Sequence, residues 1–405
     1  MEMIFIIKTF LLMIFLSLFT INSCSYNRMM EEDLIQVKVN KPDEILEKIN
    51  SMNLDEKIGQ LFIVGFDGES NLTQEDILLI NDYKVSGFIF FRRNIQSSDQ
   101  VVKLINEIKT INKNGSNIPM FLSLDQEGGT VTRLPNEIIK FKSARDIGKI
   151  NNEQYAYDTA RVMGELVHSL GFNMNFAPVL DVYTNPENTV IGSRAFSSDK
   201  EIVSKLAVAT MKGLKDSGVI AVGKHYPGHG DTKEDSHYEL PIVNHDYERV
   251  KDIELYPFKM AIENGIDSIL VSHLLYKNID SENIATLSKV FLDDILMREL
   301  RFRGIVITDD MIMNGLTKNN SITEACLKAL QAGVDILLIG SGYQNIVDSI
   351  NFIKNAVLNG EISEFEIEKK VYSVLKMKQK YNVNNDNVSK INVDEFNDKI
   401  RNLSY

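Results

Sequence analysis

Tryptophan is absent from this chain of 405 residues, and cysteine occurs only twice. Any aromatic surface that contacts a ligand must therefore come from the 20 phenylalanines and 14 tyrosines. The two cysteines, Cys24 and Cys326, are too few to build a disulfide-rich scaffold. Cys326 lies among apolar residues in a helical pattern, so we expect it to belong to the core.

Positive charge is also in short supply. The chain has 44 Lys and Arg against 56 Asp and Glu, which gives a formal net charge of −12. No basic stripe offsets this excess, so we exclude nucleic acid as a partner because its phosphates would be repelled. With 44% hydrophobic and 25% charged residues, the composition is that of a globular chain with a sizeable core.

The N-terminal apolar run is too short to cross a bilayer as a helix. Lys8 precedes the apolar residues 9–20, and Ile21-Asn22-Ser23-Cys24 follows in the pattern of a bacterial lipoprotein cleavage site. We predict a lipoprotein signal peptide over residues 1–23, lipidation of Cys24 and a polar tether over residues 24–42. Ordinary cleaved secretion and an uncleaved anchor are the alternatives. The expected location is the cell envelope, with the protein anchored by lipid to the periplasmic or extracellular face of a membrane.

From about residue 43 the sequence alternates helical patterns with short apolar segments. Eight of these segments read as buried strands: 61–64, 87–91, 120–124, 173–177, 219–223, 268–271, 304–308 and 335–339. Eight strands separated by helices predict an α/β fold, a TIM (β/α)8 barrel that forms a single catalytic domain over residues 43–382. A doubly wound open sheet is the runner-up. The Asn- and Asp-rich tail, residues 383–405, is expected to pack loosely.

Polar or charged residues follow nearly every predicted strand, which is where TIM-barrel enzymes carry their active sites. These residues are Arg92-Arg93-Asn94, Asp125-Gln126-Glu127, Asp181, Lys224-His225, Ser272-His273, Asp309-Asp310 and Ser341. A barrel with a purely structural role has no need for this pattern. The sequence therefore predicts a site at the C-terminal ends of the strands.

The segment 224–241 concentrates titratable groups and reads as a loop, because Gly and Pro interrupt it. It holds three of the six histidines of the chain. Asp235 and His237 are two residues apart, so the carboxylate can fix the imidazole tautomer and leave the other ring nitrogen for proton transfer. A hydrogen bond that only stabilises the loop is the alternative. His225, His229, Asp231 and His237 could in principle bind a metal, but Pro227 and Gly228 rule out helical ligand spacing, and we expect no metal.

Asp309 directly follows a buried strand, which would hold its carboxylate rigidly, as a nucleophile requires. Asp310 should point the other way along the strand and cap the following turn. A buried ion pair is the alternative for Asp309. Asp125, which precedes Gly128-Gly129, suits a bidentate contact with vicinal hydroxyls, or else only caps a turn. Arg133 and Arg194 are candidates for binding hydroxyl or carboxylate groups, or are ordinary salt-bridge partners.

Taken together, these motifs resemble those of glycoside hydrolase family 3, in its branch of β-N-acetylglucosaminidases. The similarity covers roughly residues 45–380. Residues 224–231 read Lys-His-Tyr-Pro-Gly-His-Gly-Asp, with Tyr where the family has Phe, and Asp235-Ser236-His237 follows after the expected gap. The other motifs are Asp125 to Gly129, Ile191 to Phe196, and Thr308-Asp309-Asp310, where Thr replaces Ser.

The resemblance implies a retaining exo-β-N-acetylglucosaminidase that acts on peptidoglycan fragments or related glycans and needs neither a metal nor an organic cofactor. Asp309 would be the nucleophile, and His237, oriented by Asp235, would be the acid and base that replaces the usual second carboxylate. The residues that would hold the terminal N-acetylglucosamine are Asp125, Arg133, Arg194, Lys224 and His225. A β-N-acetylglucosaminide phosphorylase, a catalytically inactive sugar-binding lipoprotein and a metal-dependent hydrolase remain open.

Overall fold

The computed structural model describes residues 43–116, 118–233, 239–317 and 320–404. The chain divides into two units, Met1–Ser51 and Met52–Tyr405. In the first unit the described residues form helix α2 (Glu44–Ser51), in which the side chain of Ile49 is buried. All other elements belong to the second unit.

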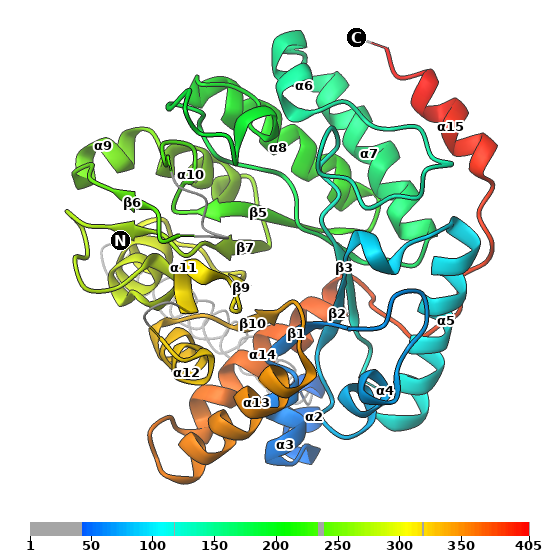
Figure 1. Cartoon of the computed structure of the whole chain (residues 1–405), viewed down its shortest axis with the longest axis vertical. Helices are drawn as coiled ribbons and strands as arrows, with labels where there is room; N and C mark the ends of the chain where they lie inside the picture. The colour runs from blue at the N-terminus through cyan, green and yellow to red at the C-terminus, as the bar shows by residue number, and fades with distance from the viewer. Residues whose placement is uncertain (1–42, 117, 234–238, 318–319, 405) are drawn as a thin grey trace, which may run out of the picture. The chain divides into compact units, whose positions relative to one another are not determined.

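Eight parallel strands of the second unit close into a barrel with helices on the outside (Figure 1). Around the barrel they are β1 (Phe62–Gly65), β10 (Ile336–Ile339), β9 (Ile305–Asp310), β7 (Ser268–Val271), β5 (Ile220–Tyr226), β4 (Met174–Asn175), β3 (Phe121–Leu124) and β2 (Gly87–Phe90). Each of the eight predicted segments forms one of these strands, which confirms the TIM barrel. The open sheet is wrong, because β1 pairs with both β2 and β10 and leaves no edge.

The strands form where they do because their residues are apolar on both faces. The four residues of β1, β2, β3, β7 and β10 are all buried. One face fills the barrel interior, where Ile63, Phe121, Met174, Ile305 and Leu338 belong to one hydrophobic cluster. The other face packs against the surrounding helices, so the sequence shows continuous apolar runs rather than alternation.

A helix follows each barrel strand and covers its outer face. In chain order these helices are α4 (Gln74–Asn81), α5 (Ser98–Gly115), α7 (Glu153–Ser169), α8 (Lys200–Asp216), α10 (Leu255–Glu263), the π-helix η4 (Val290–Glu299), α12 (Ile322–Ala332) and α13 (Tyr343–Leu358). Side-chain caps set several of their starts: Asn152 accepts a hydrogen bond from the backbone of Tyr155 in α7, and Asp199 does the same for Ile202 in α8.

The second unit has further elements besides the barrel strands and the helices that cover them. They are α3 (Leu54–Gly59), α6 (Ala144–Ile150), α9 (Tyr247–Asp252), α11 (Asn314–Thr317), α14 (Glu364–Lys380), α15 (Val393–Arg401), η1 (Arg92–Asn94), η2 (Gly192–Arg194), η3 (Ala285–Leu287) and a parallel pair, β6 (Ile242–Val243) and β8 (Leu275–Tyr276). Among the described residues, no helix combines the length and apolar character that a membrane crossing requires.

The expectation of a loosely packed tail is wrong. Asn392 caps α15 by accepting from the backbone of Glu395, and the side chains of Phe396, Asn397 and Ile400 are buried. These three positions have the spacing of one helix face, so an amphipathic helix packs where the Asn-rich composition had suggested fraying. Helix α15 lies against α7.

Candidate active site

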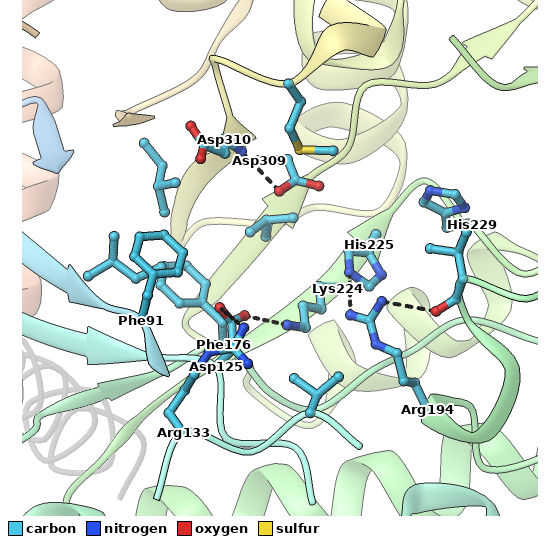
Figure 2. A pocket seen from close by; sticks show the side chains of 16 residues that line it. Phe91, Asp125, Arg133, Phe176, Arg194, Lys224, His225, His229, Asp309 and Asp310 are labelled. Carbon is cyan, nitrogen blue, oxygen red and sulfur yellow. Dashed lines mark hydrogen bonds and ion pairs between the residues drawn. The ribbon is translucent and has the colours of Figure 1, made fainter. Parts of the chain in front are cut away.

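A cavity of about 230 Å³ lies at the C-terminal ends of the barrel strands (Figure 2). Six residues predicted from the sequence line it together: Asp125, Arg133, Arg194, Lys224, His225 and Asp309. They come from four places along the chain, after β3, in η2, and at the ends of β5 and β9. The barrel therefore brings these residues together, although nearly 200 positions of sequence separate the first from the last.

Two strands extend further toward the cavity than expected. Strand β5 was predicted to stop at residue 223, but it continues through Lys224 and His225, since Tyr226 still pairs with Val271 of β7 after a register shift. Strand β9 likewise continues through Asp310, which pairs with Leu338 of β10. In a closed barrel each strand has two neighbours, so pairing persists beyond the apolar run that marks the strand in the sequence.

Asp125, Lys224 and Glu127 form a charge cluster beside the cavity, in which Lys224 and Glu127 are buried and Asp125 is half-buried. The Lys224 Nζ lies 2.7 Å from Oδ1 of Asp125 and 2.7 Å from Oε1 of Glu127. Arg133 Nη2 is 3.6 Å from the other oxygen of Asp125, a longer and weaker contact. Burial alone would raise the pKa of Glu127, but Lys224 and Arg194 outweigh burial and hold that pKa well below its ordinary value.

Arg194 is clamped between three partners. Its Nε and Nη2 donate to the two oxygens of Glu127 at 2.9 and 2.8 Å, a bidentate pair. Its Nη2 also lies 3.0 Å from Nε2 of His225, and its Nη1 donates to the carbonyl of Val190 at 3.3 Å. Figure 2 shows the guanidinium beside His225 at the edge of the cavity, joined to the imidazole by a dashed line. The cationic group is thus fixed before any ligand binds.

Asp181 lies behind His225 and is fully buried. Its Oδ2 is 2.7 Å from Nδ1 of His225, and its Oδ1 accepts from the backbone nitrogens of His225 at 3.3 Å and His229 at 2.7 Å. Burial would raise the pKa of Asp181, but the interactions with His225 and His229 lower it, so the carboxylate is ionised. Burial lowers the pKa of His229 to about 4, which keeps that imidazole neutral.

Asp309 faces the charge cluster from the other side of the cavity (Figure 2). The backbone nitrogen of Asp310 donates to Oδ1 of Asp309 at 2.9 Å, which fixes the rotation of the carboxylate. Asp310 itself accepts from the backbone nitrogens of Gly340 at 2.9 Å and Ile312 at 3.3 Å. Its side chain thus caps the turn after β9, as predicted, but Asp310 also lines the same cavity as Asp309, so the expectation that it points away from the site is wrong.

Aromatic rings form part of the cavity wall. Phe91 and Phe176 both line it, which matches the expectation that phenylalanine or tyrosine must serve where tryptophan is absent. The guanidinium of Arg93 lies 4.7 Å from the centre of the Phe91 ring. Apolar ring faces beside a cluster of hydrogen-bonding groups are well suited to a sugar, which has both apolar C–H faces and polar hydroxyls.

Three predicted residues lie outside the described part of the chain. Asp235 and His237 fall in the segment 234–238, and Cys24 falls before residue 43. Their proposed roles, and those of the residues gathered in the cavity, stay predictions.

Glu127 is a site residue that the motifs did not single out. This residue stands two positions after Asp125, so its side chain points to the same side of an extended backbone, a signal that could have placed it beside Lys224. Asp181 stands out in the sequence as a polar residue after a strand, but the sequence does not indicate its partner. Its pairing with His225 could not be found, because only the barrel brings the ends of β4 and β5 together.

Three of the four candidate metal ligands, His225, His229 and Asp231, have other partners, and His237 lies outside the described residues. His225 uses both ring nitrogens, on Asp181 and Arg194, and Nδ1 of His229 lies 2.7 Å from the hydroxyl of Thr232. Asp231 contacts Nε2 of His245 at 2.5 Å. Within the described ranges, no three His, Cys, Asp or Glu side chains are grouped so that they could hold a metal ion.

Comparison with known proteins agrees with this geometry. The family model "Glycosyl hydrolase family 3 N terminal domain" matches residues 53–377. The chain is 32% identical over 325 residues to beta-hexosaminidase A of Pseudoalteromonas piscicida, an alignment that covers 75% of this chain and 54% of that protein. It is 34% identical over 276 residues to a beta-hexosaminidase of Methylobacillus flagellatus, which covers 67% of this chain and 77% of that protein.

A solved structure shows the same similarity in three dimensions. The glycoside hydrolase family 3 beta-N-acetylglucosaminidase from Paenibacillus sp. str. FPU-7 aligns with a TM-score of 0.83 at 36% identity. That alignment covers 87% of this chain and 68% of the Paenibacillus chain. Because the family model spans most of the sequence, the chain belongs to glycoside hydrolase family 3, and the barrel brings its motif residues Asp125, Arg194, Lys224, His225 and Asp309 to one cavity.

Proposed function

We propose that the protein is a retaining, exo-acting β-N-acetylglucosaminidase. One observation carries the proposal: Asp309 shares a cavity with a preformed cluster of hydroxyl-binding groups, Asp125, Lys224 and Arg194. The names of the similar proteins support the choice of sugar. The cavity of about 230 Å³ is smaller than the roughly 300–1,000 Å³ of typical ligand pockets, so it suits one terminal sugar rather than a glycan chain.

The cluster supplies complementary groups for the sugar hydroxyls. Lys224 and Arg194 donate hydrogen bonds, while Asp125 accepts them. Because Glu127 holds both cations in place, the donors need little reorganisation when the sugar enters. Phe91 and Phe176 supply apolar surface beside them.

The reaction then proceeds in two displacements. In the first, the Asp309 carboxylate forms a bond to the anomeric carbon while the bond to the leaving oxygen breaks, and that oxygen takes a proton from His237. In the second, water attacks the same carbon, gives a proton to His237 and releases Asp309. Two inversions at one carbon retain the β configuration. Because a neutral His237 does not repel an anion at the second step, phosphate could take the place of water as the acceptor.

We further propose that the mature protein begins at a lipidated Cys24 and works in the cell envelope on peptidoglycan fragments or related β-linked glycans. The sequence before Cys24 and the polar stretch after it support this location. Cys24→Ala should move the protein from the membrane fraction to the soluble fraction and abolish incorporation of a labelled fatty acid. Unchanged membrane association of Cys24→Ala would refute lipidation.

The activity is tested with the chain that begins at Ser25. We would supply the 4-nitrophenyl β-glycosides of N-acetylglucosamine and of glucose in the presence of EDTA, with and without phosphate, and follow the anomer first formed by NMR. The expected result is selective release of β-N-acetylglucosamine under EDTA at a rate independent of phosphate. A sugar 1-phosphate product would instead identify a phosphorylase, and a folded protein without turnover would refute the enzyme assignment.

A further inference from the structure

Asp181 is built into the site although it does not line the cavity. It is fully buried and yet accepts hydrogen bonds from three groups: the His225 imidazole, the His225 backbone and the His229 backbone. Removing a carboxylate from water is costly even when donors surround it, so we expect Asp181 to have a role that offsets this cost. The contacts of His225 show what that is.

The two contacts of the His225 ring allow only one tautomer. An ionised carboxylate has no hydrogen to donate, so Nδ1, at 2.7 Å from Asp181, must carry the hydrogen. A guanidinium has no acceptor, so Nε2, at 3.0 Å from Arg194, must offer its lone pair. These contacts place the hydrogen of the ring on Nδ1 and its lone pair on Nε2. A second proton on Nε2 would face an N–H of Arg194 and add a positive charge beside it.

We propose that Asp181 is a positioning residue of the sugar-binding pocket: it fixes the Nδ1–H tautomer of His225, and the Nε2 lone pair of that tautomer holds Arg194 in its sugar-binding orientation. Glu127 holds the same guanidinium from the other side. Two carboxylates thus orient Arg194: Glu127 contacts it directly, and Asp181 acts through the imidazole of His225. The kinetic consequences, though not the tautomer, rest on the proposed function.

The substitution Asp181→Asn tests this chain of contacts because it changes hydrogen-bond polarity and almost no volume. If the amide oxygen keeps the two backbone N–H groups, the amide NH₂ faces Nδ1 of His225. Nδ1 must then become an acceptor, its hydrogen moves to Nε2, and Nε2–H opposes Arg194. If the amide turns over, its NH₂ opposes both backbone N–H groups, which makes two mismatches instead of one. The less costly arrangement therefore switches the tautomer and releases Arg194.

Nitrogen NMR of the protein labelled with [¹⁵N]histidine reads the tautomer directly. The chain has six histidines, and His225→Gln assigns the signals of His225 by their loss. In the unchanged protein we expect the hydrogen on Nδ1, and in Asp181→Asn on Nε2. A wild-type spectrum with the hydrogen on Nε2, or with both nitrogens protonated at pH 7, would overturn the proposal even if Asp181→Asn failed to fold. This measurement needs no catalytic activity.

Kinetics separate positioning from simple destabilisation. Asp181→Asn should lower kcat/KM on 4-nitrophenyl β-N-acetylglucosaminide about tenfold or more, mostly through KM, because Arg194 binds the sugar before and during the reaction. In a His225→Ala background the same change should alter kcat/KM less than about twofold, because no imidazole remains to transmit it. Equal losses in both backgrounds would show that Asp181 does not act through His225.

A matched control lies at the opposite end of the barrel. Asp267 precedes β7 and also has three donors, with Lys215 Nζ at 2.9 Å, Tyr381 Oη at 2.7 Å and Lys380 Nζ at 2.5 Å. Asp267→Asn should lower stability but leave KM and the His225 signals unchanged. If Asp267→Asn raised KM as much as Asp181→Asn, the kinetic effect would be a general consequence of losing a carboxylate, and the positioning role would be refuted.

Discussion

The substitution Glu127→Gln removes the negative charge that lies between Arg194 and Lys224 and changes the side-chain volume very little. Glu127 is only 5% exposed and faces two cations, Arg194 at 15% and Lys224 at 3% exposure. Gln can still accept with its oxygen, but its NH₂ then opposes an N–H of Arg194. Breaking a buried ion pair by removing one partner costs about 3–5 kcal/mol, because the remaining charges lose their counterion.

This cost should appear in both stability and catalysis. A loss of this size in a domain larger than 250 residues lowers the melting temperature by on the order of 5–10 °C. Lys224 and Arg194 also lose their common anchor, so we expect kcat/KM to fall by about 100-fold or more, in line with ~2.7 kcal/mol or more of lost transition-state binding. Differential scanning fluorimetry and the aryl glycoside assay measure the two effects on the same sample.

A surface carboxylate with the same kinds of partner provides the control. Glu165 also meets one arginine and one lysine, Arg161 at 2.6 Å and Lys399 at 3.4 Å, but its side chain is 30% exposed and theirs are 44% and 39% exposed. Water screens such pairs, so Glu165→Gln should cost only about 0.2–1 kcal/mol per pair and leave kcat/KM unchanged. If Glu127→Gln melted within a degree of Glu165→Gln, the argument that the buried cluster holds the site together would be wrong.

Three further predictions concern single side chains. Asp309→Ala should abolish turnover of the aryl glycoside and leave the circular dichroism spectrum unchanged, because no covalent intermediate can form; near-native activity would rule out its role as nucleophile. His237→Ala should slow chitobiose cleavage far more than 4-nitrophenyl release, because a poor leaving group needs protonation; equal losses would count against an acid role. The buried His229 has a pKa of about 4 against 6.5 for an ordinary histidine, so the unfolded chain takes up a proton on this imidazole first as the pH falls. The free energy of unfolding should therefore drop by up to about 3 kcal/mol between pH 6.5 and pH 4, and this loss should be absent from His229→Gln in urea unfolding at pH 7 and 4.5.

The barrel could be predicted because its signal is local. Each strand is an apolar run that the fold buries on both faces, so runs such as 304–308 and 335–339 mark strands without knowledge of their neighbours. Continuation of β5 into Lys224 and His225 could not be predicted, since it depends on the pairing of Tyr226 with Val271. The helix of the tail was missed because Asn-rich composition was weighed above the spacing of Phe396 and Ile400.

The site likewise has a part that could be predicted from the sequence and a part that could not. Motif residues such as Asp125 and Lys224 could be named from the sequence, because the chemistry of their side chains and their position after a strand are both local features. What could not be named is how they are connected. The Asp181–His225–Arg194 chain joins three segments that only the closed barrel makes neighbours, and its hydrogen-bond polarity depends on distances between them.

The pairing of the first barrel strand with the last has a consequence for how the protein is made. Phe62 of β1 pairs with Leu337 of β10, so the ribosome must synthesise almost the whole domain before the barrel can close. Until then β1 and β9 both present unpaired, strongly apolar edges, the kind of surface on which nascent chains aggregate. A truncation before residue 336 would therefore cost far more than one strand, because it would leave the sheet open beside β9, the strand that carries Asp309.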